Sequence, residues 1–163
     1  MNPPRLAPRR YTESMGYFQA LAVAAFFLAD APSVPSGWKV LKDSKGACQI
    51  AIPADWDEQA GFAVLKDSTT AIAVVTSQPG QTLKPLSETA LKTLRVPKEK
   101  IFENSTRRVY YQDKIAANPS DTNAFSIMVP GKAGTCSARV VFLPEVTGET
   151  ARKIVLSAGP ALE

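Results

Sequence analysis

Short apolar runs with a period of two recur along the chain after residue 36, and each run ends in residues that favour turns. Two such runs flank the polar residues 43–46, and the second ends before Pro53, which is typical of a β-hairpin. Because side chains alternate across a strand, Cys48, Ile50 and Ile52 share one face. The pattern predicts an antiparallel sheet, with strands at 38–41, 48–52, 62–65, 71–75, 101–103, 107–112, 124–129 and 136–143.

Two segments instead show the spacing of three and four residues that marks an amphipathic helix. The leucines between Gln81 and Pro97 predict a helix of about ten residues, and the apolar residues of 151–158 predict a second helix that ends at Gly159-Pro160. The run 71–75 is nearly all apolar, so we expect it in the middle of the sheet with both faces covered. Together these features predict one α+β domain over residues 37–160, an antiparallel β-sheet with helices packed on it.

Residues 1–31 have the three-part layout of a secretory signal peptide. Three arginines within the first ten residues precede an apolar run at 16–28 and the triplet Ala29-Asp30-Ala31. The apolar run is shorter than the roughly 20 residues that a transmembrane helix needs. We therefore expect a cleaved signal peptide, a linker at 32–36, and a periplasmic or secreted chain with no transmembrane span after cleavage. An uncleaved anchor and, from the pair Arg9-Arg10, twin-arginine export are the alternatives.

Cys48 and Cys136 are the two cysteines of the sequence, and each lies in a strand-like apolar stretch. In an exported chain a lone pair of thiols usually becomes a disulfide, because the environment is oxidising. We therefore predict a Cys48–Cys136 disulfide, whose loop closure contributes about 4 kcal/mol in the chain-entropy model. The alternative is two separately buried, reduced thiols.

The sequence contains no histidine. This excludes the commonest general base, the imidazole ligand of zinc sites and the usual triads built around serine or cysteine. Two thiols alone do not complete a typical zinc shell, and no glycine-rich phosphate-binding motif occurs. We therefore expect no catalytic residues, no metal and no cofactor.

The basic charge of the chain is mild. The net charge is +4, well short of the clustered basic stripe that nucleic-acid binding demands. Arginines and tyrosines are interleaved at 107–111, but on a strand Arg107 and Tyr111 face one side while Arg108 and Tyr110 face the other. These side chains cannot form one patch, so we expect no nucleic-acid partner.

Several segments together resemble the PsbP and Mog-type superfamily, which includes many small exported bacterial proteins. They are a Gly-Trp start at 37–38, the strand and turn Ile50 to Trp56, a middle helix, long antiparallel strands and the ending Ala151 to Ser157. The resemblance covers residues 37–160. It implies an α-β-α sandwich that acts by presenting its surface to other proteins, and it assigns no functional residue to this chain.

These observations predict an exported, non-catalytic binding or accessory domain that contacts another protein or a component of the cell envelope. Loops carry most recognition, so the candidate contact residues are the acidic turn Asp55, Asp57 and Glu58, and the polar loop residues Asn118, Ser120 and Asp121. A small-molecule or lipid-binding module is the first alternative. A histidine-free enzyme built on Asp55 and Asp57 is the second. Trp38 and Trp56 are interpreted as packing residues, with a ligand groove as the alternative.

Overall fold

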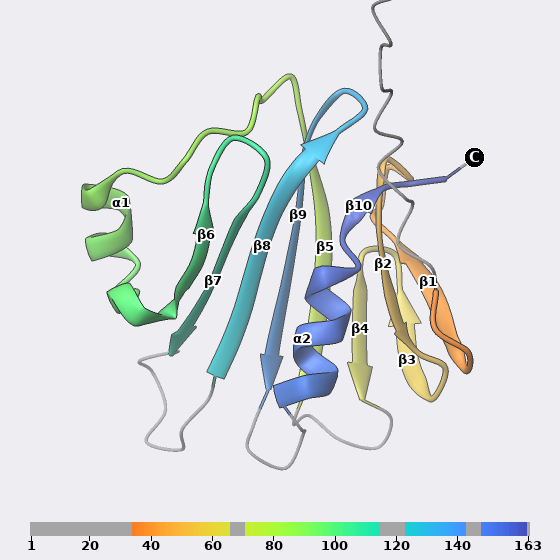
Figure 1. Cartoon of the computed structure of the whole chain (residues 1–163). Coiled ribbons are helices and arrows are strands. Elements are labelled where there is room, and N and C mark those ends of the chain that lie inside the picture. The colour runs from red at the N-terminus through yellow and green to blue at the C-terminus, as the bar shows by residue number, and fades with distance from the viewer. Residues whose placement is uncertain (1–33, 66–70, 115–122, 143–147, 163) are drawn as a thin grey trace, which may run out of the picture.

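Two antiparallel sheets make up most of the computed structural model, which describes residues 34–65, 71–114, 123–142 and 148–162 (Figure 1). The larger sheet has seven strands in the order β3-β4-β5-β9-β8-β7-β6. Its strands are β3 (Trp56–Gln59), β4 (Phe62–Leu65), β5 (Ala71–Pro79), β6 (Ile101–Asn104), β7 (Val109–Lys114), β8 (Asn123–Gly131) and β9 (Gly134–Phe142). The smaller sheet has the order β1-β2-β10, formed by β1 (Trp38–Lys42), β2 (Cys48–Pro53) and β10 (Gly159–Pro160).

Helical structure is sparse in the described part of the chain. It consists of α1 (Glu88–Thr93), one turn of 3₁₀ helix η1 (Lys98–Lys100), and α2 (Gly148–Leu156). Helix α2 lies beside the smaller sheet and contacts β9, β8 and β2, whereas α1 lies beyond the β6 edge of the larger sheet (Figure 1). No helix within the described residues is long and apolar enough to cross a membrane.

The predicted α+β fold with helices packed on a sheet is wrong, and so is the α-β-α sandwich that the superfamily resemblance implied. The chain is mostly β, with ten strands in two antiparallel sheets and only two short α-helices in its described residues. One face of the larger sheet is covered by the smaller sheet together with α2, rather than by a layer of helices. Only α2 buries a helical face there, through Ala151, Ile154 and Val155.

The predicted middle helix is shortened to six residues for a local reason. Arg95, the second residue after the helix, has a positive φ of 55°. The N–H of the next residue, Val96, donates to the carbonyl of Leu91 at 3.1 Å. This is the hydrogen-bonding pattern of a Schellman motif, which ends a helix. Leu83 and Val96 are buried outside the helix, in one cluster with Val109 of β7. The leucine spacing therefore reflected one shared packing surface rather than a long helix.

The main core lies between the two sheets and α2. It is built from alternate residues of the strands, as the period of two predicts, and β2 is buried along most of its length. Its largest fully buried side chains include Ile50 and Ile52 of β2, Ile127 of β8, Val140 of β9 and Ile154 of α2.

The strand at 71–75 is an interior strand, as predicted, but it is longer and covered less evenly. β5 continues to Pro79, and its buried residues Ala71, Ala73 and Val75 alternate with half-buried ones, so only one face is fully covered. β3 and β10 were not predicted, because β10 has only two residues and three of the four residues of β3 are exposed and polar. The signal peptide and linker predicted at 1–31 and 32–36 lie outside the described residues, except for residues 34–36.

Candidate binding site at the disulfide-linked end

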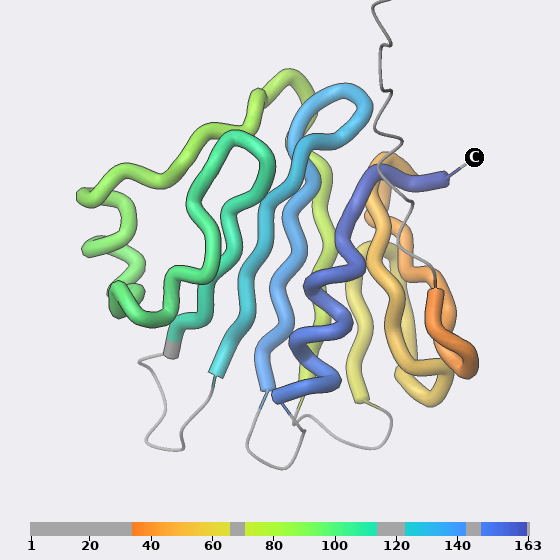
Figure 2. The backbone as a smooth tube through the Cα atoms, in the orientation of Figure 1, coloured from red at the N-terminus to blue at the C-terminus, as the bar shows by residue number. Residues whose placement is uncertain are grey.

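A cleft of about 330 Å³ lies where the two sheets meet at one end of the molecule. We call it the disulfide cleft. Its walls come from the β1–β2 turn, the end of β5, the β8–β9 turn and the residues after β10, which all gather at the same end of the chain trace (Figure 2). Its lining residues are Lys42, Gly46, Ala47, Cys48, Ser77, Gln78, Pro79, Gly131, Lys132, Ala133, Gly134, Thr135, Ala161 and Leu162.

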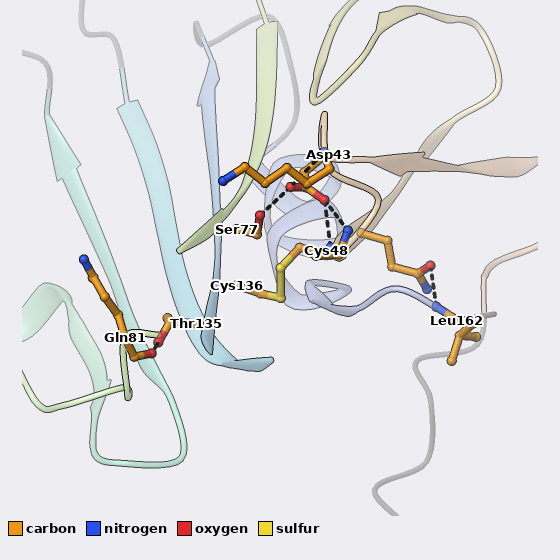
Figure 3. Close-up of a disulfide and its surroundings, with 10 residues drawn as sticks. Asp43, Cys48, Ser77, Gln81, Thr135, Cys136 and Leu162 are labelled. Atoms are coloured by element: carbon orange, nitrogen blue, oxygen red, sulfur yellow. Dashed lines mark hydrogen bonds between the residues drawn. A yellow bond between two sulfur atoms is a disulfide. The ribbon is translucent and has the colours of Figure 1, made fainter. Parts of the chain in front are cut away.

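The predicted disulfide is confirmed and joins the two sheets at this end. Cys48 of β2 and Cys136 of β9 are bonded, with their Cα atoms 5.6 Å apart (Figure 3). The alternative of two separate thiols is therefore wrong. Both cysteines are buried, with exposed fractions of 2% and 0%, so the bond lies beneath the cleft and fixes its two walls relative to each other.

Asp43 holds the β1–β2 turn against the end of β5. One carboxylate oxygen accepts hydrogen bonds from the backbone N–H of Ala47 at 2.7 Å and of Cys48 at 2.8 Å, and the other accepts from Ser77 Oγ at 2.6 Å (Figure 3). Burial alone would raise the pKa of this carboxyl. The hydrogen bonds from Ser77, Cys48, Ala47 and Lys45 outweigh that effect, so the pKa of Asp43 lies below its ordinary value.

The β8–β9 turn forms the opposite wall and approaches β5 closely. A Cβ atom on Gly134 would lie 2.2 Å from the carbonyl oxygen of Gln78, so only glycine fits there. Beside it, the N–H of Gly80 donates to the carbonyl of Ala133 at 2.8 Å, and Thr135 Oγ1 donates to the carbonyl of Gln81 at 2.7 Å (Figure 3). This wall is therefore held by backbone as well as side-chain hydrogen bonds.

The residues after β10 close the third side. The N–H of Ala161 donates to the carbonyl of Ala47 at 2.9 Å, and the N–H of Leu162 donates to Gln49 Oε1 at 3.1 Å. Lys42 Nζ donates to the carbonyl of Leu162 at 3.2 Å. Leu162 is 51% exposed, so this rim presents apolar surface to solvent.

The cleft is suited to binding an apolar group beside an anion. Lys42 and Lys132 are the charged residues among those that line it, and none of the lining residues is acidic or aromatic. The hydroxyl of Ser77 donates a hydrogen bond to the carboxylate of Asp43, so neither group is available as a base or a nucleophile. Within the described residues, no group of three or more His, Cys, Asp or Glu side chains could hold a metal ion.

The candidate contact residues of the acidic turn do not line this cleft. Asp55 lies in the turn before β3, and Asp57 and Glu58 belong to β3, an edge strand of the larger sheet. Glu58 lies 3.7 Å from Lys39 Nζ, and all three acidic residues are exposed. The other candidates, Asn118, Ser120 and Asp121, lie outside the described residues.

The interpretations of the aromatic residues are confirmed. Trp56 is 2% exposed in the main core, and Trp38 packs against the same cluster. Tyr110 belongs to the main core, whereas Tyr111 packs with Val109 on the other face of the larger sheet. The tyrosines therefore point to opposite faces, as the strand periodicity predicts.

The lining residues of the disulfide cleft were missed by the sequence analysis. Residues 130–134 were expected only as the connection between two strands, and Lys42 lay between the predicted strand 38–41 and the turn 43–46 with no role assigned to it. The signal that could have found them was the predicted disulfide itself, because it places the β1–β2 hairpin beside the start of β9. No protein-family model and no curated protein matches this chain. The resemblance to the PsbP and Mog-type superfamily therefore stays a prediction.

Proposed function

We propose that this chain is an exported, non-catalytic binding domain that holds a segment of a partner protein in the disulfide cleft. The observation that carries the proposal is the way the cleft is built. A disulfide, the hydrogen bonds of Asp43 and the close contact at Gly134 all fix its walls. Walls held in this way lose little conformational freedom on binding, which favours affinity. The disulfide is also compatible with an extracellular location.

Binding without catalysis is supported by how the polar groups of the cleft are used. Both oxygens of Asp43 already accept hydrogen bonds, and the sequence has no histidine to activate a hydroxyl. A protein segment fits the lining better than a small aromatic or lipid ligand does. The lining is rich in glycine, alanine and backbone groups and contains no aromatic side chain, whereas small-molecule sites are usually lined by hydrophobic and aromatic side chains.

Site-specific photo-cross-linking in the producing cells tests this proposal. A photoreactive phenylalanine analogue replaces Ala133, which lines the cleft and is exposed, and in the control protein it replaces Thr89, which is exposed on α1. We expect a discrete protein adduct from position 133 only. A second substitution that fills the cleft, Ala47→Trp, should abolish that adduct while the chain remains folded.

Two outcomes would contradict the proposal. The first is the same set of adducts from both positions, and the second is an adduct at position 133 that persists in the Ala47→Trp protein. An adduct with lipid alone, and none with protein, would instead favour the lipid-binding alternative.

A further inference from the structure

We infer that the bound segment is extended and acidic, carries an apolar side chain, and crosses the β8–β9 turn. This inference rests on the proposed function and names the chemistry of the partner. It comes from two hollows and a group of cations that the fold brings to the same end of the molecule.

A second hollow of about 300 Å³ lies on the other side of the β8–β9 turn. It shares Gly131, Ala133 and Gly134 with the disulfide cleft, so the turn stands between the two as a common wall. Its other lining residues are Gly80, Gln81, Thr82, Leu83, Thr106 and Pro130. A segment that occupied both hollows would therefore pass over the tip of the turn, where Lys132 and Ala133 are exposed.

The turns around these hollows carry mainly positive charge. Lys42 and Lys132 line the disulfide cleft, Lys45 is next to its lining residue Gly46, and Arg107 follows Thr106 of the second hollow. We call these four exposed residues, Lys42, Lys45, Arg107 and Lys132, the cationic end. The turns that carry them lie together at the upper end of the trace (Figure 2).

The carboxylates described near the cationic end offset only part of this charge. The carboxylate of Asp43 contributes one negative charge, but it is buried and both of its oxygens already accept hydrogen bonds. Glu103 is paired with Arg108, with 2.6 Å between the carboxylate and the guanidinium. Like-signed charges around a concave surface attract a partner of opposite charge and raise its association rate. The partner segment is therefore expected to be acidic.

The shape of the two hollows favours a protein segment over a flat anionic lipid surface as the ligand. Pro79, Ala133 and the exposed Leu162 give the disulfide cleft apolar walls beneath its lysines. An apolar side chain with carboxylates on either side would fill the cleft and meet the cations at its rim. A lipid headgroup surface would use the cations but leave both hollows unfilled.

A binding measurement with defined probes tests the inference on the full exported chain. The probe is a short fluorescent peptide of alternating glutamate and leucine, and the controls are a lysine–leucine peptide and a glutamate–glycine peptide. We expect the glutamate–leucine peptide to bind more tightly than either control and to bind less tightly at high salt. The double substitution Lys45→Glu and Lys132→Glu should raise its Kd by about tenfold.

The matched control is Lys92→Glu with Lys100→Glu, which reverses two exposed lysines on α1 and η1 and should leave the Kd unchanged. Circular dichroism and thermal unfolding should show that both double variants are folded. Equal binding of the three peptides, or an equal effect of the two double variants, would overturn the inference. So would binding of the chain to phosphatidylglycerol vesicles, but not to the glutamate–leucine peptide.

The cross-linking experiment separates this inference from the proposed function. If the protein adduct from position 133 persists after charge reversal of the cationic end, the partner segment is not acidic, but the binding role stands. If the unaltered chain gives no specific protein adduct, the binding role itself is contradicted.

Discussion

Asp43 shows how a single buried side chain can organise a turn and a cleft wall together. Its carboxylate accepts hydrogen bonds from the N–H groups of Ala47 and Cys48 and from the hydroxyl of Ser77 on β5. Each oxygen is thus satisfied by donors rather than left unpaired in the interior. Because these donors favour the ionised form, they lower the pKa of Asp43. The stability of this end of the molecule should therefore decrease on acidification.

A carboxyl whose pKa is lower in the folded state stabilises the fold above its unfolded pKa, near 4. This contribution is lost as the pH falls through the lower, folded pKa. We expect the free energy of unfolding in urea to decrease on acidification below about pH 4. Asp43→Asn should lower it by about 1–2 kcal/mol at neutral pH, because hydrogen bonds to a charged acceptor are lost. The variant should also show a weaker acid dependence than the unaltered chain, and an equal acid dependence would contradict this account.

At the scale of elements, one row of side chains crosses the larger sheet on the face away from the smaller sheet. The strand register places Tyr111 of β7 opposite Ser126 of β8, and Ser126 opposite Arg139 of β9. Arg139 donates one hydrogen bond to Ser126 Oγ at 2.7 Å and another to Asp113 at 2.8 Å. The side chain of Asp113 is only 8% exposed. Arg139 therefore compensates a buried charge across three neighbouring strands.

Removing this arginine should destabilise the sheet more than removing a surface cation. We expect Arg139→Met to lower the free energy of unfolding by about 2 kcal/mol, a value below that for a fully buried pair because Arg139 itself is partly exposed. The double variant Asp113→Asn with Arg139→Met should recover part of the loss, since no buried charge then remains. Lys153→Met breaks the exposed pair with Glu149 and should change stability little. Urea unfolding of the four proteins checks this, and no recovery in the double variant would contradict it.

The elements differ in how far the sequence could predict them. The strands of β2, β8 and β9 were predictable because their alternate residues enter one core, so the period of two is visible in the residues themselves. The middle helix was overestimated because Leu83 and Leu91 pack in one cluster from segments of different conformation. β3 and β10 could not be predicted, because β10 has two residues and β3 carries three exposed polar ones.

At the scale of the whole molecule, the candidate site depends on pairings that a local pattern does not contain. Lys42 and Lys132 are far apart in the sequence and line the same cleft only because β2 crosses β9 there. The acidic residues Asp55, Asp57 and Glu58 formed a visible cluster in the sequence, yet they lie on and beside an exposed edge strand. Local composition thus indicated a charged segment, whereas the cleft is made by contacts between distant segments.

The disulfide is the covalent link between those distant segments, and its loss should affect the entire fold. The bond closes a loop with a sequence separation of 88 residues, for which the chain-entropy model gives about 4 kcal/mol as an upper figure. Reduction of the unaltered chain adds no cavity and no new side chain, so it isolates the contribution of the cross-link. We expect reduction to lower the free energy of unfolding by about 2–4 kcal/mol.

The double variant Cys48→Ala with Cys136→Ala should lower the free energy of unfolding slightly more than reduction does, because both cysteine side chains are fully packed and alanine leaves cavities in their place. It should not respond to reductant at all. Urea unfolding of the two proteins with and without reductant measures these differences. Equal stability of the oxidised and reduced chains would show that packing between the sheets, rather than the cross-link, fixes the walls of the disulfide cleft.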